Sequence, residues 1–295
     1  MRIPGLRGMG PFALVKEAVK DFLDDDMSTY ASALAYQVLF SLFPFAIFLV
    51  ALLGFLDLSN FFDWLLTQAA MVLPHEAMDQ VNQVIKQLQQ PKGGLLSFGA
   101  VLALWTASAG VRAIMNAMNV AYDVQEGRPA WKLYPLSLLY TLGLAAMLIA
   151  ATALLLLGPQ AIQWLAHYIG LEQLFVTLWT WLRWPVILFL LCLAVAIVYY
   201  VAPDVEQEFR FITPGSVLAV AVWIAASLGF NFYVSNFAHY NATYGSIGAI
   251  IVLLLYFFIS SAVLLFGAEI NAVIEHHAES GKEPGEKTIP ESRKH

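Results

Sequence analysis

The chain has 295 residues, of which 60% are hydrophobic and 12% are charged, and its mean hydropathy is +0.69. This balance leaves no room for a second soluble domain and predicts one membrane domain that fills the chain. The net charge of −6 argues against a nucleic-acid-binding protein, and the single cysteine, Cys192, excludes an intrachain disulfide, a cysteine-based zinc site and a thiol couple.

Residues 1–29 form a polar N-terminal segment before the first apolar stretch. Within it, residues 12–22 place apolar side chains on one face at helical spacing and charged side chains on the other. We expect a helix that lies on the membrane surface. Residues 78–88 repeat this pattern and predict a second interfacial helix between the first two spans.

Six apolar stretches follow, and each is long enough to cross a hydrocarbon core about 30 Å thick, which needs about 20 helical residues. The prediction is an all-α membrane domain of six transmembrane helices over residues 30–275, with amphipathic interfacial helices and a disordered tail at residues 276–295. The expected spans are residues 31–56, 94–121, 133–157, 184–201, 214–234 and 247–270.

Lys and Arg residues fall mostly on one side of these spans. Of the 15, 4 precede the first span, 3 lie in residues 110–132, 1 lies in residues 202–213 and 4 lie in the C-terminal tail. Lys86, Lys92 and Arg183 occupy the other connections. Because cytoplasmic loops carry the excess of positive charge, both termini are expected in the cytoplasm.

The second span carries a stripe of polar residues. Ser108, Arg112, Asn116, Asn119 and Asp123 are spaced by three or four positions, which places them within about 80° of one another around a helix. Such a stripe cannot face acyl chains, because unpaired polar groups cost several kcal/mol each in lipid. Two interpretations are open. In the first, the stripe lines a polar cavity in which Arg112 can bind an anionic group. In the second, the stripe holds helices together and the Arg112 side chain extends to the membrane interface.

Other spans carry weaker polar faces. Gln37 and Ser41 share a face of the first span with Pro44, which removes a backbone hydrogen bond and predicts a hinge. The fifth span adds Asn231 and the sixth adds Asn271. Glu269 points elsewhere on the sixth helix. The predicted substrate-binding residues are therefore Gln37, Ser41, Ser108, Arg112, Asn116, Asn119, Asn231, Glu269 and Asn271.

The residue pattern argues against an enzyme. Phosphodiester hydrolysis needs clustered carboxylates with metals, or a His pair, and RNA binding needs a basic groove. The six histidines are scattered over connections and the tail, and there is no Gly-rich phosphate loop and no GxSxG elbow. We expect no catalytic residue, no metal site, no cofactor and no ribonuclease activity.

Four separated blocks of sequence carry a resemblance. The blocks are YASALAYQVLFSLFPF at 30–45, WTASAGVRAIMNAMNVAYDV at 105–124, FITPGSVLAVAVW at 211–223 and YNATYGSIGAIIVLLLYFFISSAVLLFGAEINA at 240–272. In this order they resemble the YihY/BrkB family of bacterial inner-membrane proteins, historically misnamed ribonuclease BN. The resemblance implies a six-helix inner-membrane architecture and brings no established catalytic set. The residues carried over from it as candidates are Tyr36, Ser41, Pro44, Ser108, Gly110, Asn119, Tyr122, Pro214, Gly215, Tyr244, Gly245, Glu269 and Asn271.

Two hypotheses remain for the function. The first is a transporter or flippase of an amphiphilic or anionic, lipid-like substrate whose headgroup meets Arg112. The second is a noncatalytic membrane scaffold, or envelope-integrity factor, in which the polar stripes only lock helices together. An ion or proton antiporter fits less well, because no Asp or Glu lies in the middle of a span. The expected partners are membrane lipids and no nucleic acid, and the oligomeric state stays open.

Overall fold

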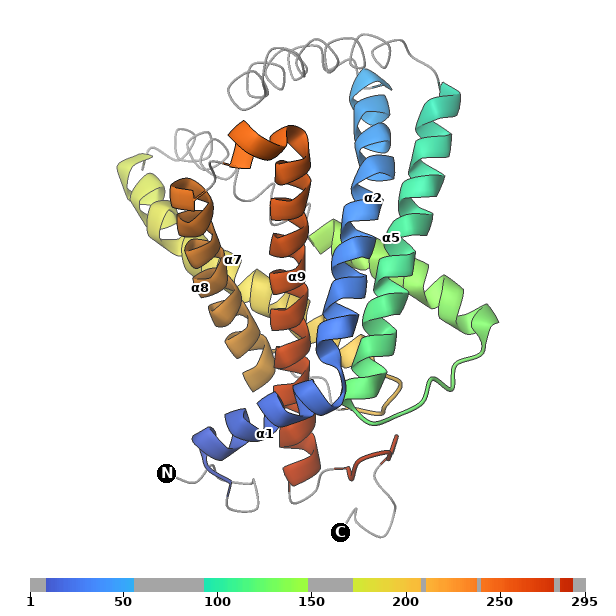
Figure 1. Cartoon of the computed structure of the whole chain (residues 1–295), viewed down its shortest axis with the longest axis vertical. Helices are drawn as coiled ribbons and strands as arrows, with labels where there is room; N and C mark the ends of the chain where they lie inside the picture. Colours follow the sequence, from blue (N-terminus) through green and yellow to red (C-terminus); the bar gives the residue numbers. More distant parts are fainter. Residues whose placement is uncertain are drawn as a thin grey trace. The chain divides into compact units, whose positions relative to one another are not determined.

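The structure is a computed structural model that describes residues 9–55, 93–147, 172–207, 211–237, 240–278 and 282–288. Within these residues the backbone forms helices and irregular connections without any strand, which confirms the all-α prediction for this part of the chain. Figure 1 shows α1 (Pro11–Asp24), α2 (Met27–Phe55), α5 (Gly93–Ala121), α7 (Glu172–Val201), α8 (Pro214–Phe237), α9 (Tyr240–His277) and an unlabelled helix at residues 130–147.

Four of the six predicted spans coincide with helices long and apolar enough to cross a membrane. The first predicted span corresponds to α2 and the third begins in helix 130–147, but both run on into residues that the structure does not describe. The second interfacial helix, predicted at residues 78–88, also lies outside the described residues. Within the described residues, the four candidate spans are Ser97–Ala121, Trp181–Val201, Pro214–Val234 and Ile250–His277.

The chain divides into two compact units, the larger one comprising Met1–Tyr36 and Val111–His295 and the smaller one Gln37–Gly110. In the smaller unit, Gln37 of α2 donates from Nε2 to the backbone oxygen of Thr106 in α5 at 2.9 Å. A Cβ on Gly110 would lie 3.4 Å from Gln37 Cγ, so a small residue allows this close approach.

The core of the larger unit is built from residues far apart in sequence. Met27 and Leu34 of α2 pack with Met115 and Met118 of α5 in a buried cluster that α7 and α9 complete. Tyr199 joins it from α7 and is 1% exposed. A bilayer supplies no hydrophobic drive between helices, so tight packing of this kind is what holds membrane helices together.

Helices α8 and α9 meet through small residues where α8 begins. A Cβ atom on Gly215 would overlap the backbone oxygen of Gly267, so the two helices approach as closely as glycine allows. Asn271 completes the contact: its Oδ1 accepts a hydrogen bond from Gly215 N at 2.9 Å, and its Nδ2 donates to Thr213 Oγ1 at 3.0 Å.

Helix α1 lies against α9, as Figure 1 shows near the N-terminus. Leu14 and Ala18 are buried against Ile270 and Val273. Most of the face predicted to contact the membrane surface is exposed: Phe12 is 84% exposed, and Val15 and Val19 are exposed as well. Phe22, at the end of this face, packs against Phe266 of α9 instead. Contact of this face with the membrane stays a prediction.

Candidate functional site

Arg112 of α5 is half-buried and directed at helix 130–147. Its Nη1 donates to Ser137 Oγ at 3.1 Å, and its guanidinium carbon lies 4.4 Å from the centre of the Tyr134 ring. Ser137 is fully buried and donates its hydroxyl to the backbone oxygen of Tyr134 at 2.8 Å. Stacking on an aromatic ring and a fixed hydrogen bond hold the guanidinium plane in one orientation.

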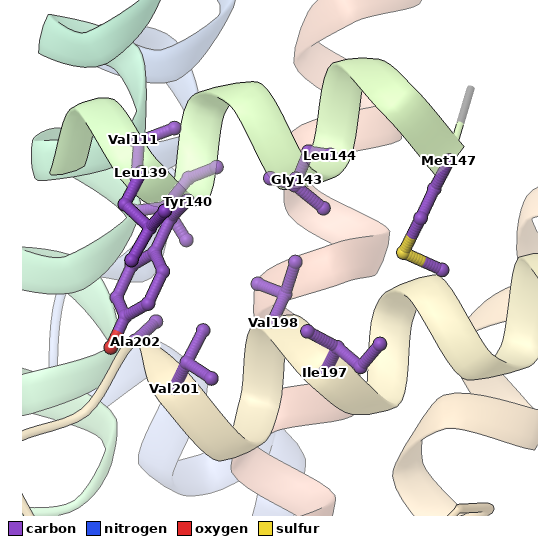
Figure 2. A pocket seen from close by; sticks show the side chains of 11 residues that line it. Val111, Leu139, Tyr140, Gly143, Leu144, Met147, Ile197, Val198, Val201 and Ala202 are labelled. Atoms are coloured by element: carbon purple, nitrogen blue, oxygen red, sulfur yellow. The ribbon is translucent and has the colours of Figure 1, made fainter. Parts of the chain in front are cut away.

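An apolar cavity of about 350 Å³ lies within one helical turn of Arg112 along α5. Figure 2 shows helix 130–147 and α7 side by side, with their side chains projecting into the space between them. We call it the apolar cavity. It is lined by Val111, Ile114, Leu139, Tyr140, Gly143, Leu144, Met147, Ile197, Val198, Val201 and Ala202.

A network of polar groups links the connection between α5 and helix 130–147 to the connection that follows α7. Asn119, 2% exposed, donates from Nδ2 to Glu126 Oε2 at 3.0 Å and accepts a hydrogen bond from Asp204 N at 2.7 Å. Asn119 therefore joins two connections that are distant in sequence.

Arg128 is the central cation of this network. It donates from Nε and Nη2 to the two oxygens of Glu126, both at 2.7 Å, and from Nη2 to Ala202 O at 2.9 Å. Burial alone would raise the pKa of the Glu126 carboxyl, but the bonds from Arg128 hold it below its usual value. The pKa of Asp204 is likewise lowered against burial, by Lys287, Gly127 and Arg128.

Part of the C-terminal tail joins the same network. Lys287 pairs with Asp204, and Glu206 N donates to Lys287 O at 2.8 Å. Lys282, 2% exposed, donates to Glu206 O at 2.6 Å and to Glu275 Oε1 at 2.8 Å. Backbone and charged groups therefore anchor residues 282–288, and the disordered tail over residues 276–295 stays a prediction.

Glu269 occupies a different environment. Its side chain is 1% exposed on α9, and its Oε1 has no hydrogen-bond partner among the described residues. It lines a second cavity, of about 200 Å³, whose walls carry several carboxylates. We call this second space the acidic cavity.

The remaining predicted residues are divided between the two compact units. In the smaller unit, Ser41 donates to Val38 O and the fully buried Ser108 donates to Trp105 O, each within its own helix. Asn116 and Asn231 are exposed. Asn271 lies at the contact between α8 and α9 already described.

Pro44 is buried within the unbroken α2, and its role as a hinge stays a prediction.

Apart from Asn119, the residues that shape the apolar cavity and the network were not predicted from the sequence. Gly143 is the clearest missed signal, because a glycine inside an apolar helix leaves space beside it. A Cβ at this position would meet no atom within 4 Å. Glu126 and Arg128 carry opposite charges near the end of a predicted span, which could have marked them as an ion pair. Their partner Asp204 could not be identified in this way, because it lies in a distant connection.

Comparisons with known proteins show which family the chain is similar to. The sequence profile described as Virulence factor BrkB matches residues 18–290. The ribonuclease-like protein YfkH of Bacillus subtilis (strain 168) is 37% identical over 263 residues, which cover 89% of this chain and 95% of that protein. No solved structure matches the chain.

More distant relatives are named as membrane proteins. A UPF0761 membrane protein of Xanthomonas campestris pv. campestris (strain B100) is 27% identical over 258 residues, covering 84% of this chain and 57% of that protein. One from Xanthomonas axonopodis pv. citri (strain 306) is also 27% identical, with 58% of its length covered. The chain thus spans little more than half the length of these Xanthomonas relatives. With a profile match over most of its length and several helices apolar enough to span a bilayer, this chain belongs to the Virulence factor BrkB family of membrane proteins.

Proposed function

We propose that this chain is a transporter or flippase of an amphiphilic, lipid-like molecule with an anionic headgroup. One observation carries the proposal: an apolar cavity lies within one helical turn of a half-buried arginine. An amphiphile needs both environments at once, because its tail is stable away from water and its headgroup requires a charge partner.

The apolar cavity suits the tail. Its volume of about 350 Å³ lies in the range of ligand pockets, and its lining is aliphatic apart from Tyr140. Figure 2 places Tyr140 at the opposite end of the lining from Met147. A chain that lies along helix 130–147 would therefore extend from the region of Tyr140 toward Met147.

Arg112 suits the headgroup. Arg112 directly follows Val111, which lines the apolar cavity. Its partners Ser137 and Tyr134 lie less than two helical turns before Leu139, the first cavity-lining residue of helix 130–147. A guanidinium is planar, permanently charged and able to donate two parallel hydrogen bonds to a phosphate or carboxylate.

A second candidate function is a noncatalytic membrane scaffold. Two residues that were predicted to line a cavity favour the scaffold. The side-chain amides of Asn119 and Asn271 use both their oxygen and their nitrogen in hydrogen bonds to neighbouring connections and helices. In a scaffold, these bonds fix the helices and no molecule crosses. A direct assay of lipid movement separates the two functions.

The test uses proteoliposomes that contain fluorescently labelled phosphatidylglycerol, with dithionite added outside to quench the outer leaflet. Wild-type protein should raise the quenched fraction from about half toward completion. Gly143→Leu should reduce the rate at least about tenfold, because the side chain fills the apolar cavity. Gly229→Leu is the matched control, since Gly229 on α8 also has open space beside it and does not line the cavity.

The same assay tests the headgroup. Arg112→Lys should keep part of the rate with phosphatidylglycerol because it keeps the charge, and Arg112→Gln should lose it. Equal rates in wild type, Gly143→Leu and protein-free vesicles would contradict transport and favour the scaffold.

The remaining assignments belong to the same proposal. We propose a multi-pass protein of the bacterial inner membrane with both termini in the cytoplasm, as the distribution of Lys and Arg supports. Membrane lipids are the proposed partners, without nucleic acid and without a cofactor. We also propose that the chain is no ribonuclease, although the name of its Bacillus relative is ribonuclease-like.

A further inference from the structure

The acidic cavity lies where α1 meets α9 and the end of α5. Six carboxylates line it, and three of them come from α1 and one from the turn after it. They are Glu17, Asp21, Asp24, Asp25, Asp123 and Glu269.

Among the described residues, the basic side chains that line the cavity are His276 and His277, and no Lys or Arg lines it. Asp24 pairs with Lys20 at 3.3 Å on the exposed side of α1, and Glu17 lies 3.5 Å from His277. The charges that act on Glu269 are those of Asp25, Asp21 and Asp123, all negative. Burial, and then repulsion from the neighbouring carboxylates, raise the pKa of Asp25 to about 6. Bringing these carboxylates together disfavours their charged forms, and a bound cation would reduce that repulsion.

Glu269 is the second, independent observation. Its side chain is 99% buried and faces this cavity, and its Oε1 has no hydrogen-bond partner in the described part of the chain. A buried carboxylate oxygen without a partner carries a desolvation cost that a bound ligand can remove. The free oxygen and the surrounding carboxylates point to the same class of ligand.

We propose that the acidic cavity binds a hydrated divalent cation, with Mg²⁺ as the type, held by Glu269, Asp25 and Asp123 through its water shell. Among the described residues no three acidic or histidine side chains are close enough to ligate a metal directly. A space of about 200 Å³ has room for several waters, and Mg²⁺ keeps much of its water when it binds carboxylates. The imidazole rings of His276 and His277 line the cavity, but no Phe, Tyr or Trp side chain does, and it is these rings that are typical of sites for organic ammonium groups.

This inference does not depend on transport, so its test uses binding and stability alone. Purified full-length protein in detergent is melted with increasing MgCl₂ at constant ionic strength, maintained with NaCl. The melting temperature should rise saturably by several degrees. Glu269→Gln should lose at least half of that rise, and Glu283→Gln, which removes an exposed carboxylate outside the cavity, should keep it.

Binding of Mn²⁺, read from electron paramagnetic resonance, gives a measurement that does not depend on unfolding. Hexaamminecobalt(III), whose ligands do not exchange, mimics a hydrated ion and should displace Mn²⁺ from wild type. Asp123→Asn provides a second variant if Glu269→Gln fails to fold, and it should weaken Mn²⁺ binding at least about fivefold. An equal Mg²⁺ response in Glu269→Gln and Glu283→Gln, a larger response to spermidine than to Mg²⁺, or Mn²⁺ that hexaamminecobalt(III) cannot displace would overturn the proposal.

Discussion

The two cavities of the larger unit have opposite chemistry. The apolar cavity, between helix 130–147 and α7, is lined almost wholly by carbon, whereas the acidic cavity, where α1 meets α9, is lined by six carboxylates. Charged groups are costly inside a bilayer and are tolerated near helix ends, where water reaches them. The comparison shows that an apolar space and an acidic space can lie in one compact unit of a membrane protein without a charge in the middle of a span.

The largest expected effect is that one variant in each cavity loses one of two measured properties, lipid movement or the Mg²⁺-dependent rise in melting temperature, and keeps the other. Gly143→Leu should abolish lipid movement and leave the Mg²⁺-dependent rise in melting temperature intact. Glu269→Gln should do the reverse and retain at least about half of the lipid movement. A variant that lost both readouts while still folding would show that the two cavities act as one site.

The polar network connects the walls of the two cavities. Ala202 lines the apolar cavity and accepts a hydrogen bond from Arg128, and Pro284 of the acidic cavity follows the anchored Lys282. The Arg128 side chain is only 15% exposed, so its removal leaves Glu126 and Asp204 partly buried without their shared cation.

We expect Arg128→Ala to cost on the order of 2 kcal/mol of stability, and to lower the melting temperature by about 4–8 °C. Lys132→Ala removes an exposed cation of the same region and should change stability by less than about 0.5 kcal/mol. Thermal melting in detergent compares the two variants. Equal losses would show that net charge, and not the network, determines the effect.

The acidic cavity should also make stability depend on pH. The folded pKa of Asp25 is raised to about 6, so the folded chain holds this proton more tightly than the unfolded chain. Its contribution therefore becomes more stabilising as pH falls from about 7 to about 4. Glu126 and Asp204 have lowered pKa values, so their contribution is present above about pH 4 and is lost at lower pH.

Melting between pH 5 and pH 7.5 without divalent cations isolates Asp25. Asp25→Asn should melt higher than wild type at pH 7.5, by a few degrees or less, and the difference should shrink toward pH 5. A constant difference across this range would rule out titration of Asp25 as its cause.

The helices could be predicted from sequence because composition alone identifies them. Spans such as Pro214–Val234 are long, apolar and nearly free of charge, so their identity does not depend on neighbours. The apolar cavity could not be predicted, because it results from how side chains of three helices fail to fill the space beside Gly143.

The polar residues show the same limit. Because Arg112 and Asn119 are polar and lie in a predicted span, the sequence indicates that they do not face lipid. It does not identify the residues to which they bond. Asn119 bonds to Asp204, 85 positions later, and Arg112 bonds to Ser137 on a separate helix. The spacing places Asn116 beside them, yet it is exposed, so one periodic stripe can pass through several environments.

The central claim is that the apolar cavity holds the tail of an amphiphile, and photo-crosslinking tests it directly. Delipidated protein in detergent is given one equivalent of phosphatidylglycerol with a diazirine on its acyl chain, and labelled residues are identified by mass spectrometry. The account predicts label concentrated on Leu139–Met147 and Ile197–Ala202, with little on Leu228 and Phe232 of α8, which are exposed and apolar. Gly143→Leu should remove this preference. Label spread equally over the cavity and α8, unchanged in Gly143→Leu, would contradict the claim.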